Sequence, residues 1–132
     1  MWLVVGGRVT ETMVKVLTKN LDLKFQGIEN VLDLVNTIYK KGLGHFEQVE
    51  GVIVLSMGCD SLVDIGWTTQ LDRLNVPVLY FNNYEDVTDN DIMSQLKNVK
   101  LIEEDGITVS RIFKEVRAAG TKQTQEGVTE YA

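Results

Sequence analysis

A chain of 132 residues, 44% of them hydrophobic, is long enough for one domain with its own core and too short for two full ones. The net charge of −6 argues against a nucleic-acid surface and against attraction to anionic lipid, since both need clustered Lys and Arg. A single cysteine, Cys59, excludes an internal disulfide and indicates a reducing compartment. The apolar stretch over residues 2–5 is too short for a membrane span and lacks the basic residues of a signal peptide. We therefore expect a cytoplasmic protein without membrane insertion.

The first half of the chain predicts two strand–helix units. Residues 2–5 are continuously apolar, as in a strand buried on both faces, and Gly6-Gly7-Arg8 turns the chain into a helix. The apolar stripe of this helix is Val9, Met13, Val16 and Leu17. Residues 21–25 alternate between apolar and polar side chains, which predicts a half-buried second strand. Asn30 is a favourable N-cap for the next helix, and Gly42 is expected to end it.

The second half predicts three further units. Residues 52–55 are all branched and apolar, which predicts a central strand. The remaining predicted elements are a helix from Ser61, a strand over 76–81, a helix after the acidic run 85–91, a short strand at 101–102 and a last helix capped by Asp105 and closed by Gly120. The stripe of that last helix is Val109, Ile112, Phe113 and Val116. The polar, aperiodic residues 120–132 predict a flexible tail or linker after a domain over 1–119.

The regular alternation of strand and helix predicts an α/β fold with a five-stranded parallel sheet between two helical layers. The first, third and fourth predicted strands are apolar throughout and belong in the middle of the sheet. The second strand alternates and the fifth is short, so both are expected at the edges. With right-handed crossovers, this arrangement favours the flavodoxin-like strand order 2-1-3-4-5.

In that order, the topological switch point lies between the first and third strands. The turn Gly6-Gly7-Arg8 would then face Ser56 and Asp60, and the amides of Gly7 and Arg8 are candidates for binding a phosphate at a helix N-terminus. The sequence matches neither a Walker loop nor the GxGxxG fingerprint. The alternative is that the glycines only permit a tight strand-to-helix turn.

Three other reactive residue types occur in the sequence. Cys59 near a helix start is a candidate nucleophile, but a half-buried thiol without a catalytic role explains it as well. His45 is the only histidine and is expected to be a surface residue. Asp60 and Asp64 share one helical face, yet as first-turn acids they need no metal to explain them. We expect no catalytic residue, resident metal or cofactor.

The chain resembles a CheY-type receiver domain over residues 1–119. The resemblance rests on the five-fold strand–helix alternation and on three local stretches. These stretches are Gly27-Ile28-Glu29-Asn30, Val49-Glu50-Gly51 and Val76-Pro77-Val78. Receivers accept a phosphoryl group on an aspartate that ends the third strand. Two acids after the first strand hold Mg²⁺, a Thr or Ser ends the fourth strand and a Lys ends the fifth.

The matching positions here depart from that pattern and read Gly6-Gly7, Ser56, Asn82 and Glu103. Ser56 stands at the degenerate phosphoacceptor position. Without the acids, no Mg²⁺ offsets the phosphoryl charge, and without the lysine, no cation stabilises it. The chain is thus similar to atypical, non-phosphorylating receivers found before the MinD/ParA-like ATPases that position tight-adherence pili and related secretion machines. The resemblance implies a role in dimerisation and localisation, with such an ATPase or a secretion or pilus component as partner.

The resemblance also implies a homodimer through the face of the fourth helix, fifth strand and fifth helix. The cations there are Arg111, Lys114 and Arg117, and the nearby acids are Asp89, Asp91, Glu103 and Glu104. Opposite charges across a two-fold axis would fix the register of such a dimer. The alternative is that both sets are ordinary solvated faces. The rival function is a small phosphate- or nucleotide-binding protein, either a binding module or an enzyme, that uses Gly6-Gly7-Arg8 and Ser56.

Overall fold

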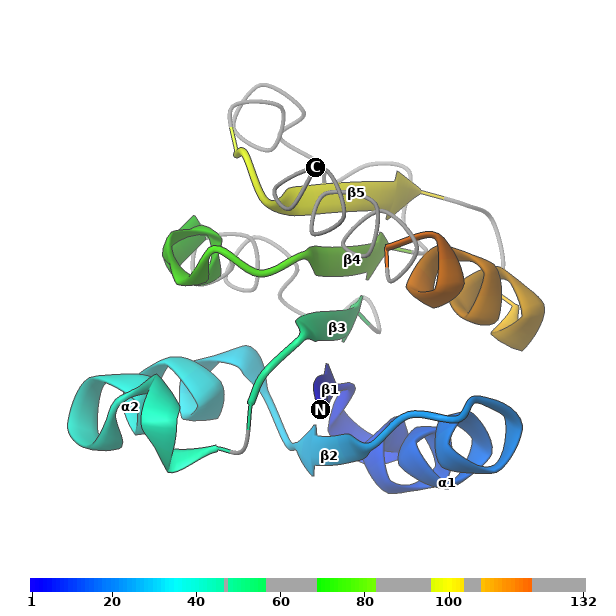
Figure 1. The fold of residues 1–132 in the computed structure, drawn as a ribbon, viewed down its shortest axis with the longest axis horizontal. Helices are drawn as coiled ribbons and strands as arrows, with labels where there is room; N and C mark the ends of the chain where they lie inside the picture. The colour runs from blue at the N-terminus through cyan, green and yellow to red at the C-terminus, as the bar shows by residue number, and fades with distance from the viewer. Residues whose placement is uncertain (47, 57–68, 83–95, 104–107, 120–132) are drawn as a thin grey trace, which may run out of the picture.

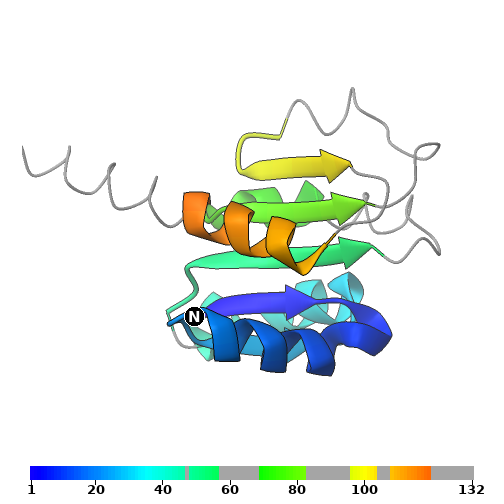
Figure 2. The same cartoon turned by 90° about the vertical axis from the view of Figure 1, so that its right-hand side faces the viewer.

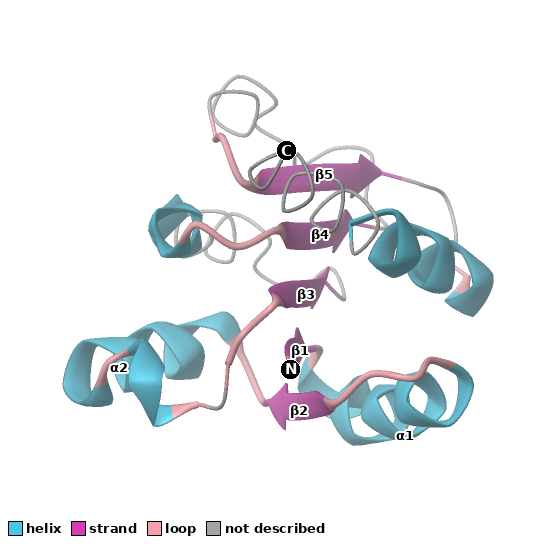
Figure 3. Ribbon diagram, viewed as in Figure 1, coloured by secondary structure: helices cyan, strands magenta, loops and turns pink. Residues whose placement is uncertain are grey.

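The computed structural model describes residues 1–46, 48–56, 69–82, 96–103 and 108–119. Their strands form one five-stranded, all-parallel sheet in the order β2-β1-β3-β4-β5, with helices on both faces (Figures 1 and 3). The strands are β1 Trp2–Val5, β2 Phe25–Ile28, β3 Gly51–Ser56, β4 Val78–Asn82 and β5 Val99–Glu103. The predicted α/β class and flavodoxin-like strand order are therefore confirmed.

Helices on the two faces of the sheet create two hydrophobic cores. α1 (Thr10–Asn20) and the helix over 109–119 lie on one face, and α2 (Val31–Lys41) lies on the other (Figure 2). The core on the α2 face includes Leu3, Val5, Leu34 and Val35. The core on the α1 face includes Trp2, Val4, Leu17 and Ile112. Successive residues of β1 thus point to opposite cores, which explains why the whole strand is apolar.

The pairing of β1 with β3 depends on a glycine. Trp2 and Gly51 are register partners in the parallel ladder. A Cβ atom added at Gly51 would lie 2.5 Å from the Trp2 Cη2 atom, so the buried indole occupies the space above this glycine. The Trp2 side chain at the start of β1 therefore fits because Gly51, at the start of β3, has no side chain.

The second strand lies later in the chain than its alternation predicts, because β2 covers Phe25–Ile28 instead of 21–25. The Leu21 N–H donates to the Leu17 carbonyl at 2.9 Å, so Leu21 closes the end of α1. The Leu23 N–H then donates to the Leu21 carbonyl at 2.8 Å, which turns the chain. The alternating pattern that predicted a strand over 21–25 therefore has another origin. Leu21 belongs to the buried end of α1, and Leu23 belongs to the turn that follows.

The ends of α2 are formed as predicted. The Asn30 side chain accepts a hydrogen bond from the Asp33 N–H at 2.8 Å, so Asn30 is the N-cap. At the other end, Gly42 has a φ of 76° and its N–H donates to the Ile38 carbonyl. A positive φ is available to glycine at little cost, which explains the end of α2 at this residue.

The helix over 109–119 is capped by Thr108, whose Oγ1 accepts from the Arg111 N–H at 3.2 Å. The predicted cap, Asp105, lies outside the described residues. Ile112 and Val116 are buried as predicted, whereas Val109 is 37% exposed and lies at the edge of the stripe. The strand at 101–102 is longer than predicted, since β5 pairs with β4 over five residues.

Most of the third and fourth predicted helices falls within 57–68 and 83–95, which the structure does not describe. Residues 69–71 are helical and continue into the 3₁₀ turn Asp72–Leu74. Leu71, the last of the helical residues, is buried in the core of the α2 face. The predicted tail, 120–132, also lies outside the described residues.

Candidate functional site

The ends of three neighbouring strands meet in one row at the carboxyl edge of the sheet. Ser56 of β3 is the register partner of Asn82 in β4, and Asn82 is in turn the partner of Glu103 in β5. Under the resemblance to receivers, these three positions would correspond to the phosphoacceptor, the hydroxyl residue and the lysine. The side chains of these three residues are outside what the structure describes, so the row is defined by the backbone register.

The glycine turn after β1 packs against the end of β3, as the switch point predicts. A Cβ added at Gly6 would lie 3.3 Å from Leu55 Cδ1, and Leu55 directly precedes Ser56. Gly7 has a φ of 57° and begins a short 3₁₀ turn, Gly7–Val9, that leads into α1. The positive φ of Gly7 favours glycine there, whereas a side chain at position 6 would only crowd the neighbouring side chains. The Arg8 side chain and Asp60 lie outside the described part of the molecule.

Two amides of this turn, those of Gly6 and Gly7, are already engaged within the protein. The Gly6 N–H donates to Thr10 Oγ1 at 2.9 Å, and the Gly7 N–H donates to the Glu29 carbonyl at 2.9 Å. Thr10 Oγ1 also lies 3.5 Å from the Ile28 carbonyl, to which it can donate. An anion at this turn would have to compete with the bond that holds the Gly7 amide.

Thr10 is a central residue of this site that sequence reasoning missed. Its side chain is buried, and it ties the end of β1 to the end of β2 through the contacts just described. A Cβ added at Gly27 would lie 2.6 Å from Thr10 Cγ2, so α1 approaches β2 closely because residue 27 is glycine. The available signal was a threonine four residues after Gly6, at a helix start, where hydroxyls bond neighbouring backbone groups.

A groove of about 670 Å³ runs beside this turn, between α1 and β2. Its lining includes the carboxylate residues Glu11 and Glu29 together with Lys15. Lys15 is paired with Glu11 at 3.5 Å on the exposed surface of α1. The charged lining of the groove is thus acidic in balance, which disfavours a phosphate there.

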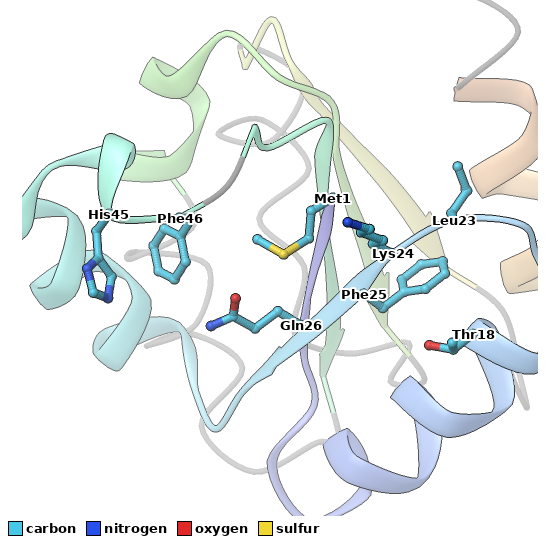
Figure 4. A pocket seen from close by; sticks show the side chains of 8 residues that line it. All are labelled: Met1, Thr18, Leu23, Lys24, Phe25, Gln26, His45 and Phe46. Atoms are coloured by element: carbon cyan, nitrogen blue, oxygen red, sulfur yellow. The ribbon is translucent and has the colours of Figure 1, made fainter.

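A second hollow, of about 500 Å³, lies at the start of β2 (Figure 4). Phe25 points toward Thr18 of α1, whereas Gln26 points to the other side of the strand, toward Phe46 and His45. His45 is exposed, as predicted, and its ring meets Phe46 edge-on at a centroid distance of 5.2 Å. This packing supplies an aromatic wall and no catalytic arrangement around the histidine.

The helix over 109–119 carries a buried carboxylate, that of Glu115, which pairs with two partly exposed cations. The Glu115 side chain is 6% exposed, and its carboxylate lies 2.8 Å from Lys100 Nζ of β5 and 3.1 Å from Arg111 Nη2. Arg111, predicted as an interface cation, is therefore bound to its own chain. Sequence reasoning missed Glu115 and Lys100. The i, i+4 spacing of Arg111 and Glu115 was the available signal.

The other two predicted interface cations, Lys114 and Arg117, are exposed. The Arg117 guanidinium carbon lies 5.8 Å from the centroid of the Phe113 ring, in a cation–π contact. The acids predicted to face these cations lie outside what the structure describes, either entirely or in their side chains. The same holds for Cys59 and Asp64.

No group of three His, Cys, Asp or Glu residues that could hold a metal ion occurs within the described ranges. The helices in those ranges also lack the length and apolar character needed to cross a bilayer. No protein-family model, curated protein or solved structure matches the chain. The function must therefore be inferred from the residues and their geometry.

Proposed function

We propose that this protein is a non-catalytic, receiver-like interaction module that does not accept a phosphoryl group. The observation that carries the proposal is the strand-end row of Ser56, Asn82 and Glu103, beside the turn Gly6-Gly7. Phosphoryl transfer to a receiver needs a carboxylate acceptor, a Mg²⁺ site and a cation at these positions. This row offers a hydroxyl, an amide and an acid, and the turn offers no side chain.

The proposed role is to associate with a second copy and with a larger assembly, in the cytoplasm. The partner class follows from the resemblance to atypical receivers: a MinD/ParA-like ATPase, or a component of a secretion or pilus machine. The five-stranded parallel sheet in the order 2-1-3-4-5 supports this reading, because it is the framework on which receivers present their helical faces.

The rival function, binding of a small phosphate or nucleotide, is supported less well. The Gly7 amide already donates to the Glu29 carbonyl, and Glu11 and Glu29 line the groove beside it. A thermal-shift measurement with nucleotides and Mg²⁺ separates the two functions. We expect no rise in melting temperature, whereas a saturable rise would favour the rival.

The direct test is incubation with acetyl phosphate and Mg²⁺ followed by intact-mass measurement. We expect no phosphoryl adduct, under conditions in which a phosphorylating receiver treated in parallel is modified. The single variant Ser56→Asp is a matched control, since it restores the acceptor but neither the acid pair nor the lysine. It is expected to stay unmodified as well. A stoichiometric adduct on the wild-type chain would contradict the proposed function.

A further inference from the structure

The outer edge of β2 is the best-defined open edge of the sheet. β2 is the terminal strand of the order β2-β1-β3-β4-β5. The Trp2 N–H donates to the Lys24 carbonyl at 2.8 Å, which fixes the orientation of the backbone. Because backbone groups alternate in direction along a strand, those of Gln26 face β1 and those of Phe25 and Gly27 face outward.

Apart from the shortness of β2, which has four residues, this edge carries none of the usual protections against pairing with another strand. Natural edge strands place charged side chains, proline or bulges along the edge. β2 reads Phe-Gln-Gly-Ile, is uncharged and pairs regularly with β1, and both Gln26 and Gly27 are exposed. The opposite edge strand, β5, carries the exposed Lys100. The two edges of the sheet therefore differ, and β2 is the one suited to accept a strand.

We propose that a second copy of this chain pairs antiparallel with β2, with the two-fold axis at Gln26. This inference rests on the proposed interaction role and names its surface. In an antiparallel ladder, two outward-facing residues that oppose each other exchange both of their backbone hydrogen bonds. With Gln26 on the axis, Phe25 of each copy opposes Gly27 of the other. If the two-fold axis lay at Phe25 or at Gly27, only that one outward-facing residue of β2 would oppose an outward-facing residue of β2 in the other copy. The register centred on Gln26 therefore forms more hydrogen bonds between the two β2 strands.

The charges around β2 select an antiparallel copy over a parallel one. Lys24 precedes the strand and Glu29 follows it, and both residues are exposed. An antiparallel second copy brings each Lys24 end to the Glu29 end of the other chain, so opposite charges meet twice. A parallel copy would place like charges together.

A cysteine cross-link tests the position of the axis. In the proposed register, Gln26 opposes its own copy in a non-hydrogen-bonded pair, whose Cα atoms lie about 4.5 Å apart, within disulfide range. In a Cys59→Ser background, Gln26→Cys should form a disulfide-linked dimer under mild oxidation. The matched control is Lys24→Cys, on the same face but opposite Ile28 of the second copy, which should cross-link far less. Equal cross-linking at both positions, or none at Gln26→Cys, would overturn the proposal.

Charged substitutions at Gln26 test the same contact between the two copies of Gln26 without covalent chemistry. In Gln26→Lys and in Gln26→Glu, like charges would meet on the axis, so each variant alone should dimerise about tenfold more weakly or worse in sedimentation equilibrium. An equal mixture of the two should restore dimers. Because the Gln26 side chain is exposed, circular dichroism should show both variants folded. A wild type that stays monomeric at high concentration, or variants that dimerise like the wild type, would refute the pairing.

The face over 109–119 provides the comparison that separates this pairing from the dimer implied by the receiver resemblance. Lys114→Glu combined with Arg117→Glu reverses two exposed cations there and spares Arg111, which is bound to Glu115. This double variant should leave the β2 dimer intact. If it abolishes the dimer while the Gln26 variants do not, the β2 inference is wrong. The phosphorylation assay is independent of both, so the proposed function can stand or fall separately.

Discussion

Replacing Thr10 with valine tests whether the glycine turn is held by its own hydrogen bonds. Valine has nearly the shape of threonine, so the substitution keeps the methyl that fills the space above Gly27 and replaces the hydroxyl with a second methyl. The Gly6 N–H, now bonded to Thr10 Oγ1 at 2.9 Å in a buried position, would lose its acceptor. A buried donor left without a partner costs about 1–3 kcal/mol, so we expect the free energy of unfolding to fall by that amount.

Thr10→Ser is the matched control, because it keeps the hydroxyl and deletes the methyl. Removing one buried methyl costs about 1 kcal/mol, including part of the cavity left behind. The Gly6 N–H would keep its acceptor in this variant. Thr10→Ser should therefore be less destabilised than Thr10→Val, although it loses more packing.

Urea unfolding measures both variants, and the slope of the free energy against urea should stay unchanged if only the folded state is affected. For a domain of this size, a loss of 1 kcal/mol corresponds to roughly 3–6 °C in melting temperature. Wild-type stability in Thr10→Val, or a greater loss in Thr10→Ser, would show that the hydroxyl does not hold the turn.

Three further predictions follow from the contacts of described residues and from the sequence. Gly27→Ala should destabilise the fold by about 1–3 kcal/mol through overpacking against Thr10 Cγ2, and adding Thr10→Ser should recover part of the loss in the same unfolding assay. Glu115→Gln should lower the free energy of unfolding by about 1–2 kcal/mol. This is less than the loss expected on breaking a fully buried ion pair, because Lys100 is 60% exposed and water can solvate it. Lys114→Ala, at an exposed neighbouring position, is the control. Truncation after Gly120 should leave the melting temperature within a few degrees of that of the full chain, because residues 121–132 include few apolar side chains. A large drop in melting temperature would show that this segment supports the core.

The strands that sequence predicts best are those buried on both faces. β1 matches its prediction because an apolar run with no polar position leaves few alternatives to a central strand. The prediction for β2 was misplaced because Leu21 and Leu23 produce a two-residue period without a strand. The residues that do form β2 include an exposed glutamine and a glycine, which favour no strand locally. Their conformation depends on β1 and α1, which pair with and pack on them.

In the candidate site, too, the features set by strand order could be predicted, whereas contacts between residues far apart in the sequence could not. The turn of Gly6 and Gly7 and its closeness to the end of β3 follow from strand order alone. The acceptor for the Gly7 amide could not be predicted, because Glu29 reaches it only once β2 has taken its register. The i, i+4 spacing indicated a contact between Arg111 and Glu115, but the burial of Glu115 and its contact with Lys100 were hidden in the same way. Burial of that carboxylate requires β5 to lie beside the helix over 109–119.

The energies at the glycine turn support the proposed function, which relies on surface contacts, over the rival function of binding an anion. A helix N-terminus at an exposed site stabilises an anion by about 0.3–1 kcal/mol. To use the Gly7 amide, the anion must first displace the Glu29 carbonyl, and an intramolecular hydrogen bond contributes about 0.5–1.5 kcal/mol. The gain and the cost therefore cancel, and the carboxylates of Glu11 and Glu29 in the adjacent groove add repulsion. At β2 the balance is reversed under the proposed pairing, because no strand of the described residues pairs with its outward backbone groups and a second copy would supply donors and acceptors in matching positions.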